Sequence, residues 1–181
     1  MINKNESFRE FFIKIVYYIS QLKEKHDIPY FEGCNPRELY MIAEQLGAEI
    51  FHVEVVLTAI RNNNINIVKS MVNKGYKNFD NGLEWASARG HLDIVKYFIK
   101  LGSCEYLSAA RSAAERGKIN IVEYFIESGY DVKLKYLLRD AAQSNHFDLV
   151  KYLVSKGADT FKDGIKYTSS IEITKYLQNF L

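Results

Sequence analysis

Histidine and cysteine side chains are the first groups in this chain to test for catalysis or metal binding. The histidines are His26, His52, His91 and His146, and the cysteines are Cys34 and Cys104. No HxxxH, HExxH or CxxC spacing joins them, so the pattern predicts no metal site and no disulfide framework. We expect both cysteines to be reduced thiols that pack as small apolar groups.

Acidic pairs and glycine motifs give no better evidence of an active site. Glu123 and Glu127 lie four residues apart, on one polar face of a helix. A general acid and base would need a desolvated cleft to separate their pKa values. No GxxxxGK(S/T), GxGxxG or GxSxG string occurs in the sequence. The sequence therefore predicts a protein that is not an enzyme and that uses no cofactor.

Composition narrows the class further. Of the 181 residues, 48% are hydrophobic and 25% are charged, which is typical of a folded domain rather than a disordered chain. The net charge is +2, too small for the broad positive field that nucleic-acid binders use, so nucleic-acid binding by the mildly basic C-terminal part is a disfavoured alternative. Neither a signal peptide nor a membrane span is predicted, so we expect a cytoplasmic protein that is not secreted.

The element that must position any binding residue is a repeat. One motif recurs as NINIVKSMVNKGY (64–76), HLDIVKYFIKLGS (91–103), KINIVEYFIESGY (118–130) and HFDLVKYLVSKGA (146–158), with a worn copy at 170–180. In each copy the apolar residues stand at i, i+1, i+4 and i+5, the spacing of one helix face. A glycine follows in the full copies, as is typical of a helix C-terminus.

A second, smaller apolar segment precedes each motif. These segments are VVLTAIRNN (55–63), LEWASARG (83–90), AARSAAERG (109–117) and LLRDAAQSN (137–145), and they share one alanine position: Ala59, Ala86, Ala113 and Ala141. We expect a first helix here in every copy, capped by Asn81, Ser108 and Thr160 in three of them. A lone helix pair cannot cover its apolar face, so the copies must stack side by side into a solenoid.

The string ASARGHLDIVKYFIKLG at 86–102 resembles the ankyrin repeat pattern AAxxGHxxIVxxLLxxGA. The resemblance covers about residues 54–181. The recurring IV(K/E)YF and LVKYLV strings are similar to the divergent ankyrin-repeat proteins of giant DNA viruses of the mimivirus type. The resemblance implies a protein that binds a partner protein through the concave helix face, and the narrower match implies a viral protein that acts on host proteins in the host cytoplasm.

Two departures from the ankyrin pattern concern the first helix and the loop before it. The T-P-L-H start is missing, and the position of its histidine is taken by Leu57, Glu84, Arg111 and Arg139. The period is also about six residues shorter than the usual 33, and the gap falls where ankyrin repeats build a β-hairpin. We therefore predict an all-α, ankyrin-type helix-turn-helix solenoid with shortened β-hairpin loops.

The repeats are predicted to fill residues 51–159, in units of about 54–80, 81–107, 108–135 and 136–159. Residues 160–181 are interpreted as a C-terminal capping repeat and residues 1–50 as an N-terminal degenerate helical capping repeat, because the ends of a solenoid core need shielding. An alternative is that a helix at 7–26 binds a partner itself. We expect a monomer.

The predicted partner-binding residues stand just before the turn between the two helices of a repeat. They are Arg61, Asn62, Ala88, Arg89, Glu115, Arg116, Gln143 and Ser144. Arg61, Arg89 and Arg116 are expected to align along one ridge, and arginine is favoured at interfaces. A solvated charged rim without a partner is the competing interpretation.

Two further side-chain types recur at fixed repeat positions and are interpreted as structural. His91 and His146 follow the inter-helix turn, where the ring can bond local backbone groups. The tyrosines Tyr97, Tyr124, Tyr152 and Tyr176 adjoin the Ile-Val core. We expect them to pack half-buried with the hydroxyl in water rather than to stack on nucleic-acid bases.

Overall fold

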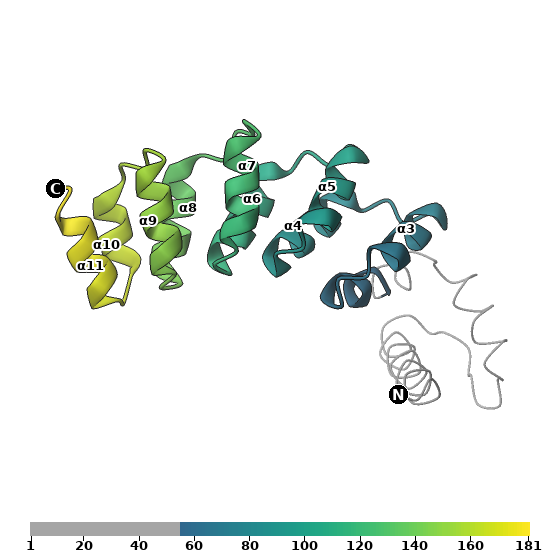
Figure 1. Ribbon diagram of the computed structural model, residues 1–181, viewed down its shortest axis with the longest axis horizontal. Helices are drawn as coiled ribbons and strands as arrows, with labels where there is room; N and C mark the ends of the chain where they lie inside the picture. The colour runs from purple at the N-terminus through teal and green to yellow at the C-terminus, as the bar shows by residue number, and fades with distance from the viewer. Residues whose placement is uncertain (1–54) are drawn as a thin grey trace, which may run out of the picture. The chain divides into compact units, whose positions relative to one another are not determined.

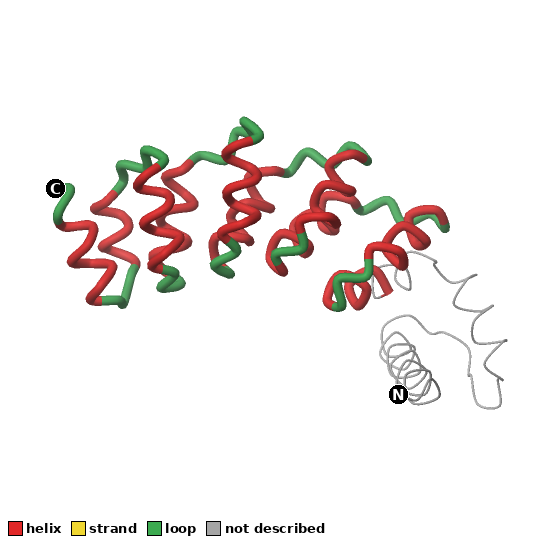
Figure 2. The backbone as a smooth tube through the Cα atoms, viewed as in Figure 1, coloured by secondary structure: helices red, strands yellow, loops and turns green. Residues whose placement is uncertain are grey.

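The computed structural model describes residues 55–181, which lie within one unit, His52–Leu181 (Figure 1). Helical residues 55–61 are followed by α3 (Ile65–Asn73), α4 (Phe79–Arg89), α5 (Leu92–Lys100), α6 (Tyr106–Glu115), α7 (Ile119–Glu127), α8 (Leu134–Gln143), α9 (Phe147–Ser155), α10 (Phe161–Tyr167) and α11 (Ile171–Gln178). Figure 2 shows helices and loops but no strand over these residues. The predicted all-α repeat solenoid with shortened loops is therefore confirmed. The cap predicted at 1–50, His26, His52, Cys34 and the helix at 7–26 lie outside the described residues.

The helices form pairs that stack in chain order (Figure 1). Helices α4, α6, α8 and α10 are the first helices of their pairs, and neighbouring members of this row pack closely on one another. The second helices, α3, α5, α7, α9 and α11, contact one another much less. Neighbouring first helices pack more closely than neighbouring second helices do. The solenoid therefore curves, with the row of first helices on its inner side. We call the surface of this row, which begins with residues 55–61, the concave face.

The recurring apolar positions account for this close stacking. Ala59, Ala86, Ala113 and Ala141 are buried, and their small side chains let neighbouring first helices approach. The anchor positions Ile94, Ile121, Leu149 and Ile173 of the second helices are fully buried. Ile67 departs from this pattern, since it is 41% exposed. Its helix, α3, is the first of the second row in the described residues, so no described second helix precedes it.

The predicted caps Asn81 and Ser108 are wrong, because α4 and α6 begin earlier, after Asn78 and Glu105. Phe79 opens α4 because its ring packs on the core, 6.3 Å from the ring of Phe98. Both predicted caps therefore lie within the first turns of their helices. Thr160 does stand at the N-cap of α10, but its side chain makes no capping bond.

The start of α6 is fixed from the preceding repeat, by Asp80. Its Oδ1 atom accepts hydrogen bonds from Ser103 Oγ (2.6 Å) and from the backbone N–H groups of Cys104 (2.9 Å) and Glu105 (3.3 Å). The bond from Ser103 is the main cause of the lowered pKa of Asp80, and the backbone bonds act in the same direction. Asp80 of one repeat thus holds the loop that leads into α6 of the next, although it does not bond the N–H groups of the first helical turn.

The turns inside the repeats are also held by the next repeat. Gly117 has φ +64°, and the ring of His146 lies directly over it. His146 Nε2 is 3.0 Å from the carbonyl oxygen of Glu115. The expectation that His146 bonds local backbone is therefore wrong, since Glu115 belongs to the preceding repeat. The ring fills the space above a glycine, so this histidine connects two repeats.

Candidate partner-binding hollow

A hollow of about 470 Å³ opens where helical residues 55–61, α4 and the C-terminal end of α6 meet. It is lined by Leu57, Ile60, Arg61, Trp85, Ala88, Arg89, Arg116 and Lys118, and we call it the basic hollow. These residues come from three consecutive repeats. The hollow therefore exists only because the repeats stack, and no single repeat contains it.

The floor of the basic hollow is apolar. Ile60 is fully buried, whereas Leu57, Trp85 and Ala88 are half-buried and lie at the surface of the first helices. Trp85 is the only tryptophan in the chain. A large ring that is half-buried on a concave surface offers contact area at little cost in conformational entropy.

The rim of the basic hollow carries only positive charge. Arg61, Arg89 and Arg116 are exposed and Lys118 is half-buried. Among the described residues, no acidic side chain lines the hollow. Four cations within one hollow produce a local positive potential that the net charge of +2 for the whole chain does not reveal.

Lys118 reaches the hollow because of the turn at Gly90. Gly90 has φ +82° and ends α4, and Asn120 Nδ2 donates to its carbonyl oxygen at 3.1 Å. A Cβ at this position would lie 3.1 Å from Lys118 Cδ, so the aliphatic stem of Lys118 lies over the glycine. The turn of one repeat thus holds a cation of the next repeat beside Arg89.

The pKa of His91 responds to the same charges. Burial is the main cause of its lowered pKa, and the positive charges of Arg89 and Lys118 lower it further. Desolvation and cationic neighbours both favour the neutral imidazole.

The residues predicted to bind a partner occupy two equivalent positions, two and three residues after each recurring alanine. The structure brings Arg61, Ala88, Arg89 and Arg116 together in the basic hollow. Asn62, Glu115, Gln143 and Ser144 do not line it, and of these Ser144 is half-buried and the others are exposed.

Sequence reasoning missed four lining residues, namely Leu57, Ile60, Trp85 and Lys118. A signal was available for Trp85, since a lone tryptophan on the surface side of a predicted helix is a common interface residue. No such signal was available for Lys118, because the position of its side chain depends on how closely the next repeat packs on Gly90.

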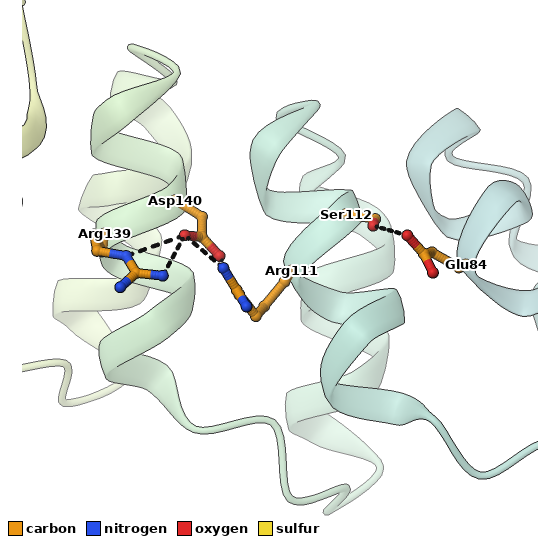
Figure 3. Close-up of polar contacts among 5 residues, drawn as sticks. All are labelled: Glu84, Arg111, Ser112, Arg139 and Asp140. Atoms are coloured by element: carbon orange, nitrogen blue, oxygen red, sulfur yellow. Dashed lines mark hydrogen bonds and ion pairs between the residues drawn. The ribbon is translucent and has the colours of Figure 1, made fainter. Parts of the chain in front are cut away.

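A second polar array joins the first helices farther along the concave face (Figure 3). Ser112 Oγ of α6 donates to Glu84 Oε1 of α4 at 2.9 Å. Arg111 Nε of α6 lies 2.6 Å from Asp140 Oδ2 of α8, and Arg139 Nη2 lies 3.2 Å from Asp140 Oδ1.

Three residues of this array stand at the repeat position where ankyrin repeats carry the histidine of T-P-L-H. They are Glu84, Arg111 and Arg139. Asp140 is 3% exposed and therefore needs these partners. Its hydrogen bond raises the pKa of Arg111. The donors and acceptors of this array are thus used within the stack.

The recurring tyrosines pack as predicted, with one exception. Tyr97, Tyr124, Tyr152 and Tyr176 are half-buried. Lys69 Nζ lies 5.6 Å from the ring centre of Tyr97, and Lys96 Nζ lies 5.2 Å from that of Tyr124, so cations of one repeat cover rings of the next. The exception is Tyr152, whose hydroxyl is buried instead of reaching water, and burial raises its pKa.

Residues 55–181 contain neither a side-chain cluster suited to a metal ion nor a helix suited to crossing a membrane. No cluster of three or more histidine, cysteine or acidic side chains in this part of the chain is arranged to hold a metal ion. No helix in the same range has the length and apolar character to cross a membrane.

Comparison with known families identifies the repeats. Residues 83–163 match the family model described as ankyrin repeats, in three copies. No curated protein matches the chain. The predicted ankyrin repeats are therefore confirmed over this segment, whereas the resemblance to giant-virus proteins stays a prediction. Ankyrin repeats generally mediate binding between proteins.

Proposed function

We propose that this chain is a non-catalytic interaction module that binds a partner protein through the basic hollow of its concave face. One observation carries the proposal: the only tryptophan of the chain and three arginines meet in one hollow, and all of these except Arg61 lie in the segment that matches ankyrin repeats. Tryptophan and arginine dominate the residues whose truncation costs most at protein interfaces. A solvated charged rim does not by itself account for a half-buried tryptophan in the same hollow.

The contrast with the rest of the concave face supports this choice. Arg111 and Arg139 are engaged by Asp140, and Glu84 is engaged by Ser112. Among the described residues, the side chains of Arg89 and Arg116 make no hydrogen bond or ion pair. Unengaged guanidinium groups beside an apolar floor are the groups that a partner can bind without first breaking contacts within the stack.

The narrower form of the proposal follows from the resemblance to giant-virus proteins. In this form the chain acts as a monomer in the cytoplasm of a host cell and its partner is a host protein. The recurring IV(K/E)YF and LVKYLV strings support it. Finding the partner among host proteins, rather than among viral ones, is the corresponding test.

Charge reversal at the rim tests the proposed function. With the full chain as bait, Arg89→Glu combined with Arg116→Glu is expected to reduce capture of the partner at least about tenfold, because the variant loses two guanidinium groups at the proposed interface and reverses the charge at both positions. The matched control is Lys77→Glu with Lys162→Glu, which makes the same change in net charge at two exposed positions outside the hollow. Capture is measured by quantitative mass spectrometry.

The control variant should capture the partner as the unchanged chain does, and both variants should keep the helical circular dichroism spectrum. Equal capture by the rim variant and the unchanged chain would remove the basic hollow from the binding surface.

A further inference from the structure

We infer that the basic hollow binds an acidic peptide segment of the partner, with carboxylates on the rim arginines and a large apolar side chain against Trp85. This inference rests on the proposed function and adds the chemistry of the partner. It follows from three features of the hollow: the sign of its rim, the absence of acidic side chains of α4 and α6 from its lining, and the apolar floor.

The first feature is the kind of cation on the rim. Three of the four cations, Arg61, Arg89 and Arg116, are arginines. A guanidinium group has a planar fork of donors that matches the two oxygens of a carboxylate, whereas an ammonium acts as a point charge. Bringing an anionic segment among these groups also relieves their mutual repulsion. The rim therefore complements carboxylates.

The second feature is that no acidic side chain of α4 or α6 lines the hollow. Glu84 Oε1 accepts the hydrogen bond from Ser112. Glu115 precedes Arg116 in the chain, and its side chain is exposed. Neither residue lines the hollow. The cations on the rim therefore have no acidic side chain from these two helices beside them in the hollow.

The third feature is the floor, which distinguishes a peptide from a simple anion. A bare phosphate or a polyanion backbone would leave Trp85, Leu57 and Ala88 without a contact. These half-buried groups lie beside the cations in the same hollow. A volume of about 470 Å³ accommodates a few side chains of an extended segment. An acidic segment with one large apolar residue uses both parts of the site.

The test uses the full chain and a defined peptide. The peptide has one leucine between two runs of three glutamates, is blocked at both ends and carries a fluorophore for anisotropy measurements. Because Trp85 is the only tryptophan, its emission from a titration with unlabelled peptide reports binding at the hollow itself. We expect saturable binding accompanied by a change in Trp85 emission. Raising the salt concentration from about 0.05 to about 0.5 M should weaken it several-fold.

Matched peptides and variants separate the contribution of the charged groups to binding from that of the apolar groups. Glutamine in place of the glutamates should weaken binding at least about tenfold, and alanine in place of leucine should weaken it several-fold. Arg89→Glu with Arg116→Glu should weaken binding at least about tenfold, and Trp85→Ala, followed by anisotropy, several-fold. Lys77→Glu with Lys162→Glu should leave the affinity within about twofold of the unchanged chain.

Each of the following outcomes would overturn the inference. They are no binding of the acidic peptide, equal binding of the glutamine peptide, and tighter binding of an oligothymidylate of equal charge. A version with phosphoserines in place of the glutamates distinguishes the source of the anion, and tenfold preference for it would replace carboxylate by phosphate recognition. If the peptide fails while partner capture still depends on Arg89 and Arg116, the inference fails and the proposed function survives. If capture does not depend on the rim, the proposed function fails.

Discussion

Replacing Asp140 by alanine is expected to lower the free energy of unfolding by about 2–3 kcal/mol, measured by urea denaturation. The buried carboxylate accepts from Arg111 of the preceding first helix and from Arg139 (Figure 3). Its removal leaves two guanidinium groups close together without a counter-charge. Both arginine side chains are about one-third exposed, so water offsets part of the loss, and the value stays below that of a fully buried pair.

The pairwise contribution can be isolated by a double-mutant cycle. Arg111→Ala and Asp140→Ala together should destabilise the chain by at least about 1 kcal/mol less than the sum of the single changes. Glu84→Ala is the matched control, because it removes one neutral-donor bond to Ser112 at a half-buried site and should cost only about 0.5–1.5 kcal/mol. Additive behaviour of Arg111 and Asp140 would show that the contact does not couple the two repeats.

Gly117→Ala is expected to cost about 2–3 kcal/mol of unfolding free energy for two separate reasons. A left-handed backbone, here φ +64°, is unfavourable for alanine. The added Cβ would also stand 2.5 Å from His146 Nδ1, so the ring must move away from the carbonyl of Glu115. Thermal and urea unfolding followed by circular dichroism would measure the loss.

A second glycine separates these two reasons. Gly129 has φ +76°, but a Cβ there meets no atom within 4 Å, so Gly129→Ala should cost only the backbone strain of about 1–2 kcal/mol. In a His146→Ala background, Gly117→Ala should fall to the same value. If Gly117→Ala and Gly129→Ala cost equal amounts in the unchanged chain, the ring of His146 does not hold the turn.

The fold was predictable because its determinants recur. The apolar spacing around Ile94, Ile121 and Leu149 gives the second helix in each copy, and the recurring alanine gives the first. The short gap between the terminal glycine and the next first helix predicted loops without strands, as observed over residues 55–181. Side chains at the repeated positions have similar surroundings in every copy. Their spacing in the sequence alone is therefore enough to predict which of them are buried.

The site was predictable only in part, because it depends on residues that do not recur. The repeat pattern located Arg61, Arg89 and Arg116, but Trp85 has Thr58 and Ser112 as its equivalents, so periodicity does not single it out. The start of α6 is set by Asp80 from the preceding repeat, a contact between residues more than 20 positions apart. Such contacts depend on the orientation of one repeat relative to the next, which cannot be read from a single sequence.

The most direct measurement of the central claim is the location of the partner on the chain. A photoreactive residue at Asn62 would stand at the repeat position of Arg89 and Arg116, beside the basic hollow, without removing a rim cation. The matched probe at Lys96 stands on an exposed position of α5, in the outer row. Crosslinking to the partner is predicted from position 62 and not from position 96. Crosslinking from position 96 alone would contradict binding through the concave face.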